Sequence, residues 1–210
     1  NCRLLDAVES ETTSAGPPGK ALLVLGFESA HHPVDGPMLI ALAIAQERGG
    51  VPGDLTSKEP DADGAGREAR RQSPPVAEAG SDPVGAWRHA FLHAPYLRDS
   101  LLACGVISDT FETAITWDRF ADFHATVMET ARRAVAEVTG APDEGPGSPR
   151  VSCRFTHVYP DGPAPYFSFH ALGRHGALLE QWRAIKTAAS DALIEAGGTI
   201  THHHAVGRDH

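Results

Sequence analysis

The chain has 210 residues, a formal net charge of −9 and 41% hydrophobic residues. This length and hydrophobic content are enough for one substantial core. The acidic balance argues against a nucleic-acid-binding protein, which would carry a basic stripe. No apolar run approaches the ~20 residues needed to cross a bilayer. The three cysteines, Cys2, Cys104 and Cys153, are far apart in the sequence. This spacing predicts reduced thiols in a cytoplasmic protein.

The N-terminal part predicts one strand and one helix, followed by a long polar segment. Lys20–Glu28 is a short apolar run behind a Gly-Pro-Pro-Gly turn and is typical of a buried strand. Pro37–Arg48 carries apolar residues at helical spacing and ends at Gly49-Gly50. Residues 51–83 are dominated by Pro, Gly, Asp, Glu, Ser and Ala. We expect a long flexible insertion there rather than a second domain.

The middle of the chain predicts two helices separated by a strand. Large apolar residues from Trp87 to Leu102 indicate a helical region that is interrupted at Pro95. Val106–Trp117 is rich in β-branched and aromatic residues and predicts a strand. Asp118 is the expected N-cap of a helix that runs to about Val138. The inner face of that helix is expected to consist of Phe120, Phe123, Val127, Met128, Ala131 and Val135.

The C-terminal part predicts a hairpin, a helix and a final strand. Arg150–Val158 and Pro165–Leu172 are joined by a Tyr-Pro-Asp-Gly-Pro turn. A helix follows, with its inner face at Leu178, Trp182, Ile185, Ala189 and Ala192. A last strand is expected to begin at Thr199–His202. Since the hairpin favours antiparallel pairing, we predict an α+β domain: an antiparallel sheet with helices packed on one face, and a ferredoxin-like order of elements.

Three consecutive histidines, His202, His203 and His204, stand near the end of the chain. Imidazoles titrate near neutral pH, so such a cluster can move protons, hold an anion or bind a metal. In a strand, His202 and His204 would lie on one face and His203 on the other. Adjacent histidines do not converge easily on one metal, and no other spacing completes a ligand set. The pattern therefore favours proton handling or anion binding, and no metal is predicted.

A second candidate is Tyr166, in the predicted strand Pro165–Leu172. Alternation places Tyr166, Ser168 and His170 on one face of the strand, and Phe167 and Phe169 in the core. A phenol can donate a proton, or act as a base when its neighbours stabilise the phenolate.

Four charged residues beside apolar segments are also candidates. Arginine binds carboxylate or phosphate in a bidentate manner, although a single one is more often part of a surface ion pair. A carboxyl group inside an apolar strand needs a partner or a raised pKa. The arginines are Arg3, Arg98 and Arg154, and the carboxyl group is that of Glu112.

Several of these motifs occur together in one known family. The segments are residues 1–6, Phe111–Ala114 with Trp117-Asp118, the Asp161-Gly162 hairpin with Tyr166, and residues 197–207 with the histidines. In this order they resemble the C-terminal part of FAD-linked oxidases of the vanillyl-alcohol-oxidase type. Within that family, the chain is most similar to the alkyldihydroxyacetonephosphate synthases. Ala205 departs from the glycine expected in the synthases.

The resemblance implies a two-part enzyme. Residues 1–210 would form the substrate-binding cap domain, a fragment of a larger protein whose other domain binds most of the FAD. Such a fragment is expected to be inactive alone. The synthases exchange an acyl for an alkoxy group through a flavin adduct. By position, Tyr166, His202, His203 and His204 match the catalytic residues, and Arg3 matches an arginine that holds the anionic group of the substrate.

Two alternatives stay open. The same architecture serves FAD-dependent 2-hydroxyacid or alcohol dehydrogenases and oxidases. The chain could also be a stand-alone α+β module that binds a metal or another ligand. The predicted partner is a small-molecule or lipid-like substrate; a homodimer is an open alternative, and neither nucleic acid nor a transmembrane segment is expected.

Overall fold

The computed structural model describes residues 1–53 and 83–204. Most of the segment predicted as a flexible insertion, 51–83, therefore lies outside the described residues. The chain divides into two compact units, and each is described separately. One unit holds Asn1 and Leu25–Glu78; the other holds Cys2–Val24 and Ala79–His210.

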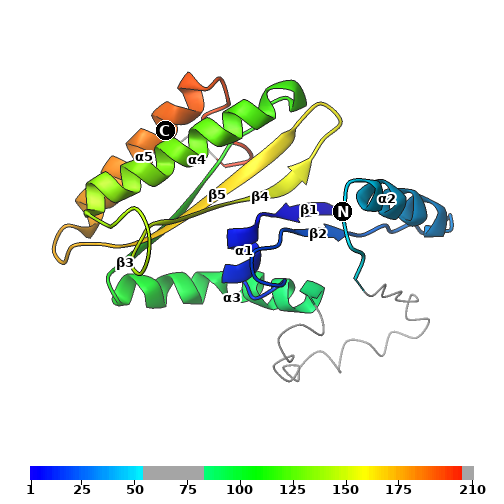
Figure 1. Ribbon diagram of the computed structural model, residues 1–210, viewed down its shortest axis with the longest axis horizontal. Coiled ribbons are helices and arrows are strands. Elements are labelled where there is room, and N and C mark those ends of the chain that lie inside the picture. Colours follow the sequence, from blue (N-terminus) through cyan, green and yellow to red (C-terminus); the bar gives the residue numbers. More distant parts are fainter. Residues whose placement is uncertain (54–82, 205–210) are drawn as a thin grey trace. The chain divides into compact units, whose positions relative to one another are not determined.

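One five-stranded sheet runs through the larger unit (Figure 1). The strand order is β2-β1-β4-β5-β3, and β4 pairs antiparallel with both β1 and β5, as β3 does with β5. The predicted α+β class with an antiparallel sheet is therefore confirmed. The strands are β1 (Cys2–Leu5), β2 (Leu22–Leu25), β3 (Val106–Glu112), β4 (Arg150–Val158) and β5 (Pro163–Leu172).

The predicted hairpin is formed by β4 and β5. Its turn packs against the segment that follows β3, where Trp117 N donates to the carbonyl of Asp161 at 3.1 Å. A Cβ atom at Gly162 would lie 2.0 Å from the carbonyl oxygen of Ile115, so only glycine allows this approach. The hairpin therefore holds the end of β3 in place.

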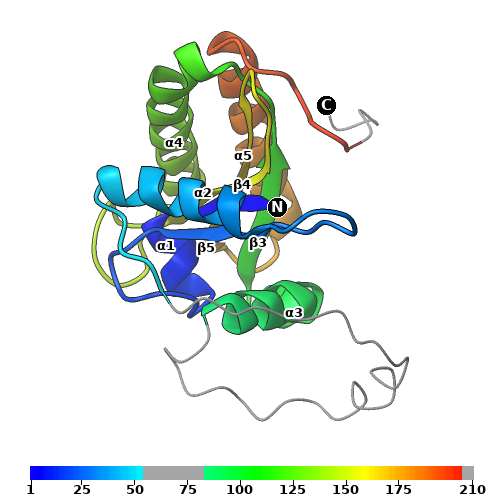
Figure 2. The ribbon, with the colours of Figure 1, turned by 90° about the vertical axis from the view of Figure 1, so that its right-hand side faces the viewer.

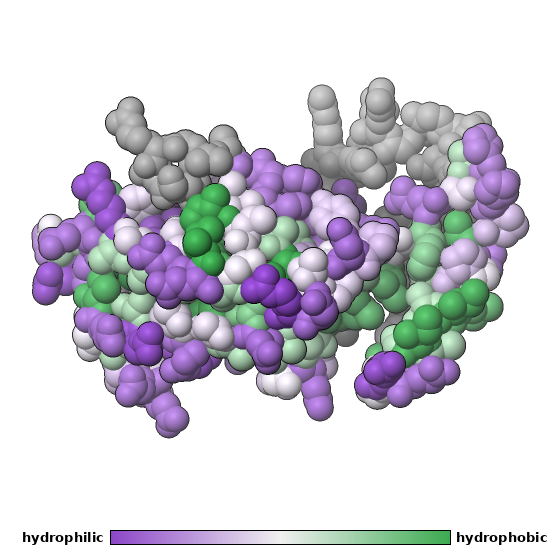
Figure 3. Space-filling view, turned by 90° about the horizontal axis from the view of Figure 1, so that it is seen from above, coloured by the Kyte–Doolittle hydropathy of each residue, from purple (hydrophilic) through white to green (hydrophobic). Residues whose placement is uncertain are grey.

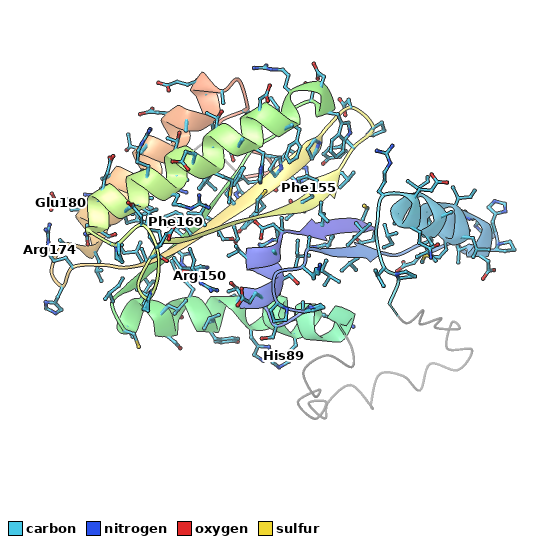
Figure 4. All side chains as sticks on the ribbon, viewed as in Figure 1. His89, Arg150, Phe155, Phe169, Arg174 and Glu180 are labelled. Atoms are coloured by element: carbon cyan, nitrogen blue, oxygen red, sulfur yellow. The ribbon has the colours of Figure 1, made fainter. Side chains whose placement is uncertain are left out.

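Two helices, α4 (Trp117–Thr139) and α5 (Leu178–Glu195), pack side by side on one face of the sheet (Figures 1 and 2). Both match their predicted ranges and inner faces closely. In the layer between sheet and helices, Figure 4 labels Phe155 and Phe169. The core includes Ile107, Phe111, Phe123, Val127, Val135, Val151, Phe155, Phe167, Phe169, Ile185 and Leu193.

The opposite side of the sheet, which we call the polar face, carries the alternate residues of the same strands. Phe167 is 0% exposed in the core, while Tyr166 and Ser168 point to the polar face, as predicted. Helix α1 (Ala7–Thr12) packs on the polar face, where Glu9 accepts a hydrogen bond from Ser152 at 2.6 Å. Neither β1 nor α1 was predicted from the sequence.

Helix α3 (Pro83–Ala103) borders β3, and Arg98 pairs with Asp109 of β3 at 3.3 Å. The predicted interruption at Pro95 is wrong, because the helix continues through this residue. Pro95 is exposed. Water can therefore bond to the backbone carbonyl that lacks its usual N–H partner.

Two predicted boundaries around β3 and the chain end are also wrong. β3 ends at Glu112 instead of Trp117, and Thr116 rather than Asp118 stands at the N-cap of α4. The final strand at Thr199–His202 does not form. In a paired strand, a backbone carbonyl would accept the hydrogen bond from Ala114 N. Here the side-chain hydroxyl of Thr199 accepts it instead, at 2.9 Å.

In the smaller unit, helix α2 (Asp35–Glu47) forms as predicted, but none of its residues is buried. Its apolar side chains Leu39, Ile40 and Ile44 are exposed, and they contribute to the green surface over α2 in Figure 3. Within residues 1–53 and 83–204, no helix is both long and apolar enough to cross a bilayer. Cys2, Cys104 and Cys153 are all free thiols, as predicted.

The aromatic core generates a stability prediction. Phe167→Ala should lower the free energy of unfolding by about 3–5 kcal/mol, because it leaves a cavity between β5 and the helices. The measurement is denaturant unfolding followed by circular dichroism. Phe27→Ala is the matched control: Phe27 is 37% exposed, so this variant should unfold almost like the parent protein. Equal losses in the two variants would contradict the proposed core.

Candidate active site

The three histidines follow α5 in a bent segment that is fixed against the end of β3. Thr113 donates its hydroxyl proton to the carbonyl of Thr199 at 2.6 Å, and Thr199 N donates to Ala114 O at 3.2 Å. Arg119 of α4 donates to the carbonyl of Ala196 at 2.9 Å and so holds the C-terminal end of α5. These contacts place the histidines beside the polar face.

The carboxylate of Glu112 lies at the centre of this group. Its side chain is only 3% exposed. His202 Nδ1 is 3.5 Å from Oε1, and His204 Nε2 is 3.5 Å from Oε2. His157 Nδ1 lies 4.0 Å from Oε1, and Thr156 donates its hydroxyl proton to Oε1 at 2.7 Å. The carboxyl group that the sequence marked as needing a partner therefore has four polar neighbours.

The four imidazoles of His157, His202, His203 and His204 are called the histidine cluster below. His203 stacks on His202 with 4.0 Å between ring centroids and contacts His157 edge to face at 4.6 Å. Burial lowers the pKa of His157, and the neighbouring His203 lowers it further. A strand would have placed His203 on the opposite face, but its ring stacks on that of His202. His202 and His204 approach the same carboxylate. They do so through a bend in which His203 has a φ of 60°, not through a strand.

Among the described residues, three of these histidines could together hold a metal ion. Nitrogen atoms of His157, His202 and His203 lie within 4.8 Å of one another. The stacked rings of His202 and His203 differ by only 22° in plane, so their lone pairs run side by side. Zn²⁺ needs nitrogen lone pairs that converge at about 2.0–2.1 Å. A metal would therefore require at least one of these rings to turn.

Tyr166 lies between the histidine cluster and two arginine-bearing strands. Its hydroxyl donates to Thr110 Oγ1 at 2.9 Å, and its ring contacts His204 edge to face with centroids 6.2 Å apart. The guanidinium carbon of Arg154 lies 4.0 Å above the ring centroid. The structure therefore brings together Tyr166 and the histidines that the sequence singled out.

Arg3 and Arg154 lie near each other on this part of the polar face. Arg3 is half-buried on β1, and its pKa is lowered by burial and then by the charge of Arg154. Arg154 forms an ion pair with Glu9 of α1. The third candidate, Arg98, is not part of this group, because it pairs with Asp109 next to α3.

Sequence reasoning missed two members of the site and gave no role to a third. His157 and Tyr159 were not singled out, although they stand at the end of β4 and in the turn beside it. The Tyr159 hydroxyl is 3.3 Å from His202 Nε2. Arg154 was one of three candidate arginines, each with a surface ion pair as the commoner alternative; its Nε is buried and has no hydrogen-bond partner among the described residues. The available signal was alternation along β4, which places Arg154 and Thr156 on the polar face.

Known proteins resemble this chain in sequence and in fold. An alkyldihydroxyacetonephosphate synthase of Caenorhabditis elegans is 38% identical over 116 residues, which are 54% of this chain and 18% of that protein. A protein of the same name from Trypanosoma brucei brucei is 28% identical over 131 residues, 62% of this chain and 20% of that protein. The matched part is thus about a fifth of these relatives.

A solved structure of an alkyldihydroxyacetonephosphate synthase has the same fold, with a TM-score of 0.64 at 16% identity. The likeness covers 94% of this chain and 34% of the solved chain. Residues 2–210 match the model of the family described as FAD linked oxidases, C-terminal domain. The chain therefore belongs to the family of C-terminal domains of FAD-linked oxidases.

Proposed function

We propose that this chain is the substrate-binding cap of an FAD-dependent enzyme similar to alkyldihydroxyacetonephosphate synthase. The observation that supports this most is the gathering of a phenol, two guanidinium groups and four imidazoles on the polar face. These groups come from β1, β4, β5 and the segment after α5. The helices α4 and α5 cover the other face, so the polar groups share one side of a rigid sheet.

The donor groups of this face fit the ring end of a flavin. Arg154 Nε and His157 Nδ1 are buried and have no hydrogen-bond partner among the described residues. A flavin ring offers carbonyl oxygens and ring nitrogens that accept such bonds. When bound, FAD supplies the capacity to take up and return an electron pair. No dinucleotide-binding glycine motif occurs in the sequence, so we assign the rest of FAD to another domain.

Tyr166 is the proposed group that exchanges a carbon-bound proton of the substrate. Its hydroxyl already donates to Thr110, and the guanidinium of Arg154 lies over its ring. A cation at this position stabilises the negative charge that a phenolate carries. His204, the imidazole in contact with the Tyr166 ring, is placed to take part in moving the proton.

Arg3 is the proposed anchor for an anionic group of the substrate. It lies close enough to Arg154 for the two positive charges to repel each other. A phosphate or carboxylate between them would relieve that repulsion and form charge-assisted hydrogen bonds. We therefore propose a small-molecule or lipid-like anion as substrate. The three free cysteines fit a cytoplasmic location, and a homodimer stays an expectation.

Two other functions stay in view. A 2-hydroxyacid carries a carboxylate that could use the same arginines, so a dehydrogenase or oxidase of this architecture is the nearest alternative. A stand-alone metal-binding module is supported only by the spacing of His157, His202 and His203. Stoichiometric zinc in untagged protein would favour the module, and its absence would favour the flavoenzyme.

Tyr166→Phe tests the proposed catalytic phenol. In the protein together with its FAD-binding part, this variant should lose about 10²–10⁴-fold in kcat, because proton transfer loses its donor. Flavin absorbance should show that FAD stays bound. Tyr96→Phe is the matched control, since Tyr96 is an exposed tyrosine on α3. Normal turnover of Tyr166→Phe would remove the residue from the mechanism.

His203 can be tested for its imidazole apart from its backbone. His203→Gly keeps the left-handed turn, and His203→Val disfavours it by about 1–2 kcal/mol. If the imidazole acts in turnover, both variants should lose activity, and only the valine variant should also lose thermal stability. Full activity of the glycine variant would assign His203 to the turn alone.

The substrate class can be tested by two assays on the same preparation. We expect exchange of an acyl for an alkoxy group, measured with a labelled alcohol, and no net flavin reduction by 2-hydroxy acids. Rapid bleaching of the flavin absorbance by a 2-hydroxy acid would instead identify a dehydrogenase.

A further inference from the structure

We propose that Glu112 is a positioning residue that holds His202 and His204 in opposite tautomers. His202 would carry its proton on Nδ1, and His204 would carry its proton on Nε2. The part of this inference that concerns turnover rests on the function proposed above. The tautomers themselves are a property of this chain and can be observed independently of any activity.

The first support is the burial of the carboxylate. A carboxylate that is 3% exposed has lost nearly all its water and needs N–H or O–H donors in its place. Thr156 supplies one donor to Oε1. The remaining close neighbours are His202 Nδ1, 3.5 Å from Oε1, and His204 Nε2, 3.5 Å from Oε2; the contact of His202 Nδ1 falls short of hydrogen-bond geometry in the structure. Both nitrogens must be protonated to act as donors, since a carboxylate only accepts.

The second support is the far side of the His202 ring. A neutral imidazole has one donor and one acceptor nitrogen. With the proton on Nδ1, the Nε2 atom of His202 is free to accept from the Tyr159 hydroxyl, which lies 3.3 Å away. This one tautomer therefore suits both polar neighbours of His202, Glu112 and Tyr159.

The third support is the backbone that joins the two histidines. His203 has a φ of 60°, in the left-handed region that few residues other than glycine adopt. In an extended strand, His202 and His204 would point in parallel and offer the same ring atom to one partner. The bend at His203 instead lets the two rings reach the two oxygens of Glu112 through different nitrogens.

This arrangement leaves different atoms free on the two rings. His204 keeps Nδ1 as its acceptor, and its side chain is 53% exposed and touches the Tyr166 ring. His204 Nδ1 is therefore the nitrogen available to a substrate proton, while His202 Nε2 is occupied by Tyr159. A carboxylate that selects the tautomer of a neighbouring imidazole also operates in the Ser-His-Asp triad.

Glu112→Gln is the variant that tests this. The side-chain oxygen of glutamine can still accept from Thr156 and His202, but its NH₂ group would face His204 Nε2. That nitrogen must then become an acceptor, so the proton of His204 moves to Nδ1. Solid-state ¹⁵N NMR of the full protein with ring-labelled histidine separates protonated from unprotonated nitrogens. Spectra of His202→Asn and His204→Asn identify the resonances by difference.

In the parent protein we expect opposite tautomers, and in Glu112→Gln we expect the two resonances of His204 to exchange while those of His202 stay. With FAD bound, kcat of this variant should fall about 10²-fold at little change in KM. Glu9→Gln is the matched control, because Glu9 is a buried carboxylate of the same face that bonds to Ser152 and Arg154 and to none of the clustered histidines. It should leave both tautomers unchanged.

The same tautomer in both histidines of the parent protein would overturn the inference, even if the variant failed to fold. An unchanged spectrum of folded Glu112→Gln would also overturn it. Opposite tautomers that respond to the variant would support it, and they would do so even if flavin-dependent turnover were absent. In that last case only the proposed function would fail.

Discussion

Glu112 is the last residue of β3, and its carboxylate has almost no contact with water. Removing such a charge from water costs several kcal/mol unless donors replace the water. In this chain Thr156 on β4 donates a hydrogen bond to it, and His202 and His204 after α5 lie 3.5 Å from its two oxygens. One buried carboxylate therefore brings together the end of the edge strand β3, the hairpin and the C-terminal segment, because its polar neighbours come from all three. The geometry of the site follows from this coupling.

Alternation along the strands places the core side chains on one face of the sheet and the candidate site residues on the other. In β5, Phe167 and Phe169 fill the layer under α4, while Tyr166 and Ser168 lie on the polar face. Because neighbouring residues of one strand serve opposite faces, a well-packed core fixes the direction of the polar side chains. The two helices thereby support the polar face from the opposite side of the sheet.

Much of the fold could be predicted from local patterns. The hairpin, α2, α4 and α5 are long or strongly periodic, and each lies within a few residues of its predicted range. β1 and α1 have only 4 and 6 residues, too few to show a period. The run Thr199-Ile200-Thr201 suggested a strand by its β-branching. It failed because the hydroxyl of Thr199, and not an extended backbone, satisfies Ala114 N.

By itself, the sequence determined the fold class and the core face of each long element, and it singled out Tyr166, the three histidines and the carboxyl group in β3 as candidate site residues. Those conclusions depend on residue type and on short-range spacing, which a sequence displays directly. Only the tertiary structure decided that Glu112 meets His202 and His204, residues 90 and 92 positions away. It also decided that Arg154 stacks on Tyr166 and that His157 joins the histidines. Contacts of this kind arise when distant strands pair and a buried charge selects its donors, and no local pattern encodes that choice.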